Sequence, residues 1–334
     1  MDQPMELGGA PAQRRGAAGD RGGLRPFVWR VLIVVGIGAL AFLVWQAADA
    51  LLLVFAGVLL AILFLRLTGP VRRWTGLGHG WGLGLVLTAL ALLVVGGGWL
   101  LGSTLAGQFG QLGSQIDGAL KALPDDLRTT ITENAANARW TSYLQSLASN
   151  IVYFLSYLVI ALFVGIYTAV SPGLYRRGLV LLVPPSGHRR AEEVLDVSGD
   201  ALWKWLMGQL VSMAVVGILT TAGLMMLGVP AALALGIVAM VLEFIPLIGP
   251  FLAAAPAVLI AFAQSPTLAI WTAALYLLIQ QIEGNIILPV AQKRVVHLPP
   301  VITVAAITAG GILFGILGMF LATPLAVVML VLVN

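Results

Sequence analysis

The chain has 334 residues, of which 60% are hydrophobic and only 10% are charged, and its mean hydropathy is +1.00. A soluble domain carries about 25% charged residues, so this composition excludes a soluble globular protein and indicates an all-α polytopic membrane protein. The absence of cysteine excludes disulfides, thiolate metal sites and cysteine nucleophiles. The basic residues lie between apolar segments, a distribution typical of membrane topology and not of a nucleic-acid-binding face.

The N-terminal part predicts a tail followed by a pair of membrane helices. Residues 1–25 are rich in Gly, Ala, Arg and Pro without an apolar period, which predicts a disordered cytoplasmic tail. Apolar segments follow at 31–48 and 51–65, and we expect a helical hairpin with Asp49 at its outer tip. A cleaved signal peptide is the alternative, but the basic region is too long for one and a second apolar segment follows at once.

The third apolar segment, at about 81–105, leads into a long polar interval. Gly98 and Gly102 form a small-xxx-small pair that would let two helices approach closely. Residues 106–150 have an amphipathic period, broken at Pro124, that predicts two amphipathic helices outside the membrane. These helices would either contact another subunit or pack back onto their own bundle.

Charge asymmetry predicts the orientation of the chain. The fourth apolar segment, 151–170, ends at Ser171-Pro172, and mixed charges over 184–204 predict a cytoplasmic helix before a fifth apolar segment at 206–227. Of the 18 Lys and Arg residues, all but three lie in the tail or in loops that we assign to the cytoplasm. The positive-inside rule therefore predicts that both termini are cytoplasmic.

Four costly residues interrupt the next apolar segment, 230–264, and they are Glu243, Pro246, Gly249 and Pro250. A charged carboxylate at the bilayer centre costs about 2.5–3.5 kcal/mol or more, and proline removes a backbone donor. Irregular backbone at membrane depth is tolerated where it is buried in protein or lines a wet cavity. The arms of about 15 residues on either side reach only roughly 22 Å, short of a hydrocarbon core of about 30 Å. The pattern predicts a re-entrant hairpin.

The second half of the chain repeats this arrangement. A span over 267–282 precedes another apolar segment, 299–334, which is interrupted by Gly310, Gly311, Gly315 and Gly318. The units 201–264 and 267–334 would have opposite orientations, as inverted repeats of secondary transporters do. The alternative is that each segment is one long tilted helix with kinks.

The repeat completes the predicted organisation. The sequence predicts about six full transmembrane helices plus two re-entrant helical hairpins, which is eight segments by the conventional count. A first-half helical frame over 26–200 would contain the outer segment 106–150 and the cytoplasmic helix 184–204. A transport core over 201–334 would contain the two repeats.

Several motifs of the second half occur together in one known family. They are Glu-Phe-Ile-Pro-Leu-Ile-Gly-Pro at 243–250, Glu-Gly-Asn at 283–285 with Leu-Pro at 288–289, His-Leu-Pro-Pro at 297–300, the glycine-rich stretch 310–318 and Ala-Thr-Pro-Leu-Ala at 322–326. In order and spacing, residues 205–334 resemble the AI-2E transporters, or autoinducer-2 exporter-like permeases. The resemblance implies an integral inner-membrane protein, and it links the chain to export of autoinducer-2 and to exchange of sodium or lithium for protons.

Six polar residues are candidates for a substrate or ion pathway: Glu243, Gln280, Gln281, Glu283, Asn285 and His297. Glu243 would either bind a cation, proton or polar solute, or accept hydrogen bonds from backbone donors that the hairpin tip leaves unpaired. Glu283 and Asn285 either line the inner mouth of the path or cap an interfacial helix, and His297 either gates the inner side or is solvated. Nine residues are expected to act as breaks and hinges: Pro246, Gly249, Pro250, Pro289, Pro299, Gly310, Gly311, Gly315 and Gly318.

The sequence contains no Walker loop, no His-Glu-x-x-His motif and no serine-nucleophile motif, so we expect neither an enzyme nor a cofactor or metal site. We expect a secondary transporter that exports a small polar solute of the autoinducer-2 type by alternating access. A cation (Na⁺ or Li⁺)/proton antiporter is the alternative, and a non-transporting membrane scaffold is the alternative of another class. The expected partners are the solute or the cation and proton, membrane lipid and further copies of the chain in a homo-oligomer, with no nucleic acid.

Overall fold

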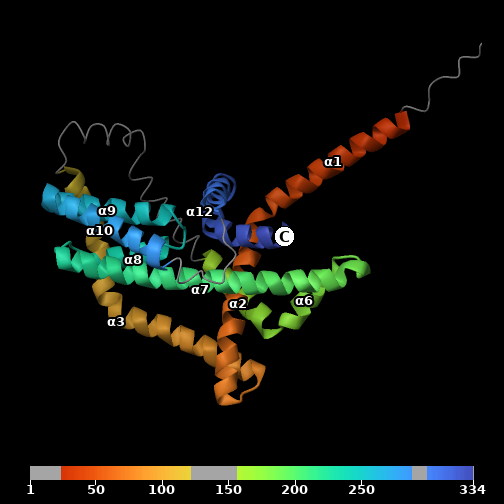
Figure 1. The fold of residues 1–334 in the computed structure, drawn as a ribbon, viewed down its shortest axis with the longest axis horizontal. Helices are drawn as coiled ribbons and strands as arrows, with labels where there is room; N and C mark the ends of the chain where they lie inside the picture. Colours follow the sequence, from red (N-terminus) through yellow and green to blue (C-terminus); the bar gives the residue numbers. More distant parts are fainter. Residues whose placement is uncertain (1–23, 122–155, 288–298, 334) are drawn as a thin grey trace, which may run out of the picture. The chain divides into compact units, whose positions relative to one another are not determined.

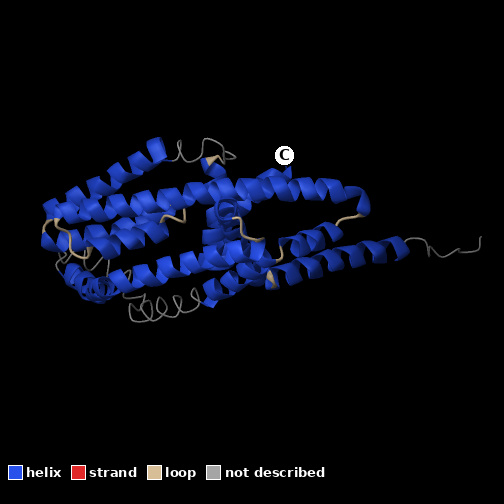
Figure 2. Ribbon diagram, turned by 90° about the horizontal axis from the view of Figure 1, so that it is seen from below, coloured by secondary structure: helices blue, strands red, loops and turns tan. Residues whose placement is uncertain are grey.

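The computed structural model describes residues 24–121, 156–287 and 299–333, and every regular element in these residues is a helix (Figures 1 and 2). The predicted all-α class is therefore confirmed. Contacts divide the chain into two units, Met1–Ala48 and Asp49–Asn334. The first unit contains α1 (Leu24–Gln46), and the second contains the other helices. We expected a frame over 26–200 and a transport core over 201–334. The two compact units do not meet near residue 200, so this division stays a prediction about which parts move during transport.

Within the described residues, four helical stretches are long and apolar enough to cross a membrane. They are α2 (Ala48–Thr75), His79–Gln108 in α3 (His79–Lys121), Pro185–Leu227 around α7 (His188–Leu227), and α12 (Pro300–Val333). A fifth would be a bent pair, in which Ser156–Val170 turns by 92° into α6 (Pro172–Leu181). The bend lies at Ser171-Pro172, as predicted, because proline lacks the backbone donor and disfavours helix in the preceding residue.

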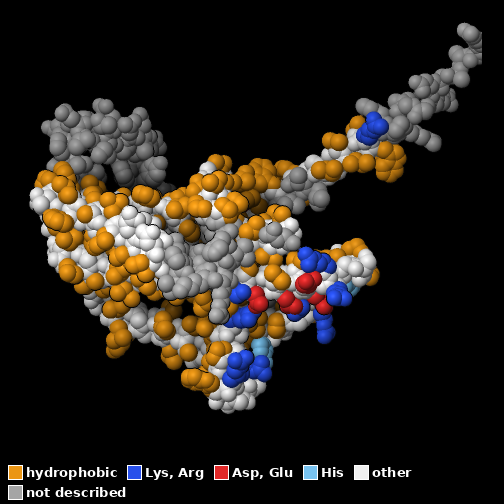
Figure 3. Space-filling view, viewed as in Figure 1, with side chains coloured by type: hydrophobic (Ala, Val, Ile, Leu, Met, Phe, Trp, Pro, Cys, Tyr) orange, Lys and Arg blue, Asp and Glu red, His pale blue; other side chains and the backbone are white. Residues whose placement is uncertain are grey.

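Helix α7 corrects one predicted boundary. The mixed-charge stretch over 184–204 does not form a helix of its own, because after the short turn η1 (Pro185–Gly187) one unbroken helix of 40 residues continues through the fifth apolar segment. No proline or glycine lies between 200 and 207 to interrupt it. Figure 3 shows acidic and basic side chains gathered over α6 and the first part of α7, a separate basic group at the end of α2, and hydrophobic side chains over much of the rest.

Helix α3 extends past its apolar part to Lys121, as the amphipathic period predicted. The second amphipathic helix, expected after Pro124, lies outside the described residues. Gln108 of α3 reaches the start of α8 (Ala232–Leu242), where its Oε1 accepts a hydrogen bond from the backbone nitrogen of Ala234 at 2.9 Å. This bond satisfies one of the unpaired donors that begin every helix.

The second part of α7 packs with α8, α9 (Ile248–Gln264) and α10 (Pro266–Ile282) as a bundle of neighbouring helices (Figures 1 and 2). Its core is apolar and closely packed around residues such as Leu224, Leu235 and Ile260. Glycines bring α7 and α8 together, since a Cβ placed on Gly236 would lie 3.0 Å from the carbonyl oxygen of Gly217.

The predicted break between α8 and α9 is present. These helices have 11 and 17 residues, or roughly 16 and 26 Å, so neither spans a hydrocarbon core of about 30 Å. Between them Leu247 has φ 70° and ψ −46°, and the Ile248 nitrogen donates to the Pro246 oxygen at 2.9 Å. This γ-turn is strained for a residue with a side chain, and Pro250 then lies in the first turn of α9, where a missing donor is tolerated.

Helix α12 has a break of its own. Gly315 has φ 61° and ψ −145°, a conformation that only glycine adopts readily. A Cβ on Gly310 would lie 2.6 Å from the Gly318 oxygen, although eight residues of straight helix would separate the two by about 12 Å. The chain therefore bends sharply at Gly315 and brings the glycines on either side into contact, as the predicted helical break requires.

The two breaks lie against each other. Phe244, from the α8–α9 turn, stacks on Phe320 of α12 with ring centroids 5.4 Å apart. Ile245 belongs to the same buried cluster as Ile307 and Ala322, which lie on either side of Gly315. Segments far apart in the sequence thus form one region of interrupted helices.

We expect Gly318→Ala to destabilise the protein, because its Cβ would collide with the backbone of Gly310 and with Phe314. Overpacking of this kind costs about 1–3 kcal/mol. Gly178→Ala in α6 is the control, since no described atom lies within 4 Å of a Cβ there. Thermal unfolding in detergent should show a lower Tm for Gly318→Ala and an unchanged one for Gly178→Ala, and equal values would contradict the close contact.

Candidate functional site

A buried polar cluster lies where α8 and α10 both end beside the middle of α7. Glu243 is the C-cap residue of α8, and Glu283 is the C-cap residue of α10 and the first residue of the π-helical turn η2 (Glu283–Ile287). Their side chains are only 1% and 5% exposed. Two carboxyl groups are therefore buried at one point in an otherwise apolar bundle.

The two carboxyl groups lie beside the same turn of α7 and are close enough to interact, since Gln209 bonds the backbone of Glu243 and Ser212 bonds Glu283. The Ser212 hydroxyl donates to Oε1 of Glu283 at 3.4 Å, and the Gln280 amide donates to Oε2 at 3.1 Å. Among the described residues, Oε2 of Glu243 has no hydrogen-bonding partner. Glu283 is thus held by two donors, whereas one buried oxygen of Glu243 lacks a donor among the described residues.

The backbone around Glu243 is held from α7. Because the helix stops at Leu242, the carbonyl of Glu243 loses the helical donor it would otherwise have, and Nε2 of Gln209 donates to it at 2.6 Å. At Glu283 the turn is π-helical, a geometry frequent at functional sites. Both carboxyl groups therefore lie where a regular helix ends.

No basic side chain neutralises this pair within the part of the chain that the structure describes. The ion pairs there are Arg66–Asp200, Arg176–Asp196 and Arg190–Glu193, and all of them lie on exposed residues. Asp200 precedes Ser212 by twelve residues of α7, or about 18 Å. Two buried carboxylates in contact would repel each other and lack solvation, so the pair requires a proton or a cation between its members.

Polar groups continue from the pair along the interface of α7 and α10. The hydroxyl oxygens of Thr220, Thr272 and Tyr276 are buried without a partner among the described residues. Ser212 bonds Glu283, and Gly223 lies beside Leu275, so the two helices are antiparallel and bring Thr220 level with Tyr276. Thr272 and Tyr276 are four residues apart on α10, and Ser212 and Thr220 are eight apart on α7, so the polar residues of each helix lie near one face.

Sequence reasoning found part of this cluster. It predicted Glu243, Gln280 and Glu283, and the structure brings all three together. Glu283 is the C-cap residue of α10, as one of the two predicted alternatives has it. It is buried, however, and does not lie on the surface of the helix bundle. The sequence did not lead us to Gln209, Ser212, Thr220, Thr272 and Tyr276. The signal that could have found them is polar residues that recur near one face of otherwise apolar helices.

The other candidates lie elsewhere. Asn285 donates to the backbone oxygen and to Oε1 of Gln281 at 3.0 and 3.2 Å, on the exposed side of the helix. These two residues are therefore not part of the buried cluster. Pro289 and His297 are outside the described residues, so their predicted roles stay predictions.

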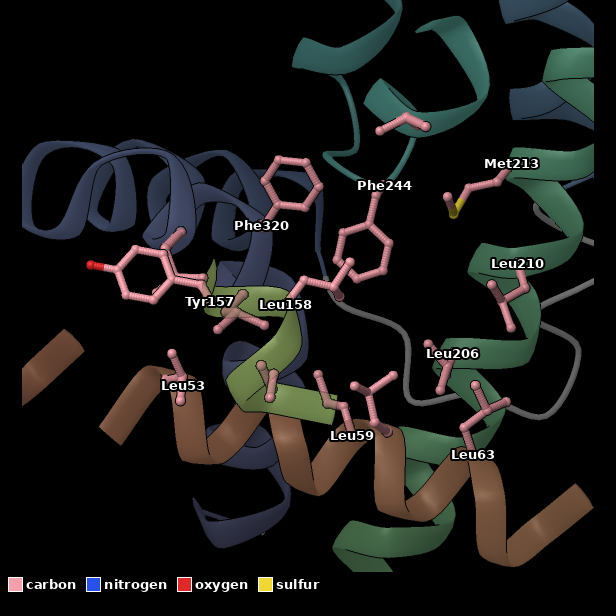
Figure 4. Close-up of a pocket in the computed structure, with 16 residues that line it drawn as sticks. Leu53, Leu59, Leu63, Tyr157, Leu158, Leu206, Leu210, Met213, Phe244 and Phe320 are labelled. Atoms are coloured by element: carbon pink, nitrogen blue, oxygen red, sulfur yellow. The ribbon is translucent and has the colours of Figure 1, made fainter. Parts of the chain in front are cut away.

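An apolar cavity of about 310 Å³ lies next to the cluster, beside the side chain that follows Glu243 (Figure 4). Phe244 and Phe320 lie on one side of it, and Leu53, Leu59 and Leu63 of α2 lie across from them. Its lining is hydrophobic, and Figure 4 shows the Tyr157 hydroxyl pointing away from the other lining side chains. A polar solute would lose its hydrogen bonds there, so the carboxyl cluster is the better candidate for polar or charged cargo.

Comparison with known proteins gives a family match over most of the chain. The family model described as "AI-2E family transporter" matches residues 31–334. The chain is 28% identical over 243 residues to "Putative transport protein YueF" of Bacillus subtilis (strain 168), covering 63% of this chain and 66% of that protein. Two relatives with the same description are each 29% identical. They are YrrI of the same strain, covering 83% of this chain and 84% of YrrI, and MT0215 of Mycobacterium tuberculosis (strain CDC 1551 / Oshkosh), covering 94% and 89%.

We expect Gln209→Leu to lower the stability of the protein, because it leaves the buried carbonyl of Glu243 without a donor. An unsatisfied buried group costs about 1–3 kcal/mol. Gln281→Leu is the matched control, since its amide lies on the exposed side. A reduced Tm for the first variant alone is expected, and a Tm equal to that of the control would show that the bond contributes nothing.

Proposed function

Since the chain belongs to the AI-2E transporter family and is a multi-pass membrane transport protein, we propose that it is a secondary transporter in which the Glu243–Glu283 pair couples cargo movement to a proton. The observation that carries the proposal is the contact of two buried carboxyl groups without a basic partner among the described residues. Intramembrane carboxyl groups are expensive, and transport proteins use them for ion pathways and proton relays.

In the proposed coupling step, a proton and a cation exchange at the Glu243–Glu283 pair. In the resting pair a proton lies between the two carboxyl groups and relieves their repulsion. A monovalent cation that enters takes the place of this proton, so the charge of the site is conserved and one proton leaves for each cation bound. Oxygen ligands suit hard cations, and the hydroxyl of Ser212 and the amide oxygen of Gln280 are close enough to complete the shell after the side chains reorient.

The interrupted helices provide the moving parts. The breaks at Leu247 and Gly315 concentrate backbone freedom beside the site, and Phe244 and Phe320 join them. We propose that the arms around each break enter the membrane from opposite sides as re-entrant hairpins, and that their rocking exposes the carboxyl pair to each side in turn. The charged end of α7, tied to α2 and α6 by Arg66–Asp200 and Arg176–Asp196, would face the cytoplasm with both termini.

Two cargoes fit this site. Exchange of Na⁺ or Li⁺ for protons is favoured by the paired carboxyl groups themselves. Export of a small polar solute of the autoinducer-2 type is favoured by the neutral donors and acceptors around them, Gln209, Ser212 and Gln280, which match a hydroxylated molecule. A non-transporting scaffold has less support, because burying two carboxyl groups lowers the stability of the protein and a scaffold has no function for them.

The homo-oligomer is also a proposal. Among the residues that the structure describes, none lies within 4 Å of a Cβ on Gly98 or Gly102, which supports a second copy packing on the small-residue face of α3.

We expect Glu243→Gln and Glu283→Gln each to reduce cation/proton exchange in proteoliposomes by at least about tenfold, the equivalent of roughly 1.4 kcal/mol of lost binding. An internal pH dye would report proton movement after an inward or outward gradient of Na⁺ or Li⁺. Glu193→Gln is the control, because Glu193 pairs only with Arg190 on the exposed part of α7.

The wild type could exchange neither cation but move a labelled polar solute. If Glu243→Gln and Glu283→Gln abolish that movement, the protein is a solute exporter and not a cation/proton antiporter. Activity of both variants at the level of Glu193→Gln would contradict the proposed role of the carboxyl groups for either cargo.

A further inference from the structure

Three hydroxyl groups are buried between α7 and α10 outside the carboxyl pair. They belong to Thr220, Thr272 and Tyr276, which are 0%, 0% and 8% exposed. Among the described residues, none of the three hydroxyl oxygens has a hydrogen-bonding partner. An unpaired buried hydroxyl lowers stability, so three of them at one helix interface indicate a polar ligand between the helices.

Threonine in a helix has a partner of its own, the carbonyl oxygen four residues earlier. Thr68 of α2 and Thr221 of α7 both donate to that oxygen, at 2.7 and 2.8 Å. Thr220 and Thr272 do not, although each lies inside a regular helix. Thr220 directly precedes Thr221 in the same helix, so the difference lies in the orientation of the Thr220 hydroxyl and not in the backbone.

The three hydroxyls lie on the side of the carboxyl pair that faces away from the charged end of α7. Thr220 follows Ser212 by eight residues of α7, or about 12 Å. Tyr276 precedes Glu283 by seven residues of α10, or about 10 Å, and Thr272 lies about 6 Å further from the pair. Because the two helices are antiparallel, the hydroxyls follow one another from the pair toward the ends where α7 stops and α10 begins.

An apolar level lies between the pair and these hydroxyls. Val216 of α7 and Ile279 of α10 occupy it, and both belong to the buried core of the bundle, each 4% exposed. A constriction lined by hydrophobic side chains excludes water and stops the passage of ions. The interface is therefore closed beside the pair and polar beyond it.

We propose that water enters between α7 and α10 from the ends where α7 stops and α10 begins, binds the three hydroxyls, and conducts protons between the Glu243–Glu283 pair and that side of the membrane. The inference rests on the coupling reaction proposed above and adds the ligand and the direction of the proton path. Water both donates and accepts hydrogen bonds, so one molecule satisfies two hydroxyls that are too far apart to bond directly. The path connects to the pair when Val216 and Ile279 move apart.

Each step of the conduction conserves protons. When a cation binds, the O–H bond of the pair breaks and its proton passes to the nearest water molecule. Every water or hydroxyl group that gains a proton gives up another to its neighbour, so each ends unchanged and one proton leaves at the far end. The cation takes over the positive charge at the pair, and no other reactant is needed.

Radiolytic footprinting of the full-length protein in liposomes tests whether water reaches the hydroxyls. X-ray pulses convert water into hydroxyl radicals, which oxidise the side chains beside it, and mass spectrometry locates the added oxygen. We expect oxidation of Tyr276 and none of Phe64, an aromatic residue that is 3% exposed in an apolar cluster. Equal protection of both residues would overturn the proposal, and this outcome does not depend on any transport activity.

Variants that keep the shape of the side chain but remove the hydroxyl test proton conduction. Thr220→Val and Tyr276→Phe should each slow cation/proton exchange at saturating cation by at least about fivefold, or roughly 1 kcal/mol of activation free energy. The cation concentration for half-maximal exchange and the Tm should stay unchanged, because neither hydroxyl has a bond within the described residues to lose. Thr221→Val is the control, since the Thr221 hydroxyl donates to the Gly217 carbonyl.

The apolar level has a test in the opposite direction. Val216→Thr keeps the size of the side chain and adds a hydroxyl between the pair and Thr220. We expect protons to leak through this variant down a pH gradient without any cation, as measured with the internal pH dye. A variant as tight to protons as the wild type would overturn the assignment of the barrier to Val216.

The outcomes separate the water path from the proposed coupling. If Glu243→Gln and Glu283→Gln reduce exchange whereas Thr220→Val and Tyr276→Phe behave like Thr221→Val, the coupling stands and the water path is wrong. If the two glutamate variants are also fully active, both proposals are overturned. A Tm that falls in step with exchange would show that the hydroxyls only stabilise the fold, which also contradicts the water path.

Discussion

The contact between the carboxyl groups of Glu243 and Glu283 is the constraint on which the rest of the structure depends. It requires two helices to end beside the same part of α7, and α8 and α10 do so, with Glu243 and Glu283 as their C-cap residues. It also requires donors from α7, which Gln209 and Ser212 supply. A protein gains little stability from two buried like-charged groups, which supports the proposal that the contact serves transport.

The strain of the interrupted helices lies next to this contact. Leu247 adopts a positive φ without being glycine, four residues after Glu243, and Gly315 turns α12 in a conformation that other residues avoid. Stacking of Phe244 on Phe320 connects the two breaks through packed side chains. Such packing has few alternative arrangements, and this suits a transporter that moves between two discrete states.

Local chemistry made part of the fold and the site predictable from sequence. Clustered prolines and glycines placed the breaks near Glu243 and Gly315, because proline lacks a backbone donor and glycine adopts conformations closed to other residues. The contact of Glu283 with Ser212, 71 positions away, depends on how the helices pack, and no local pattern encodes it. The unbroken α7 was missed because a change from charged to apolar composition marks the edge of a membrane and not the end of a helix.

The central claim is that a proton lies between Glu243 and Glu283 and leaves when cargo binds, and infrared difference spectroscopy of the protein in lipid tests it most directly. The account predicts a protonated carboxyl band that disappears on addition of Na⁺, Li⁺ or the polar solute, with the release of one proton. The band should be absent from Glu243→Gln and Glu283→Gln. A band that no cargo alters, or one that persists in both variants, would contradict the account.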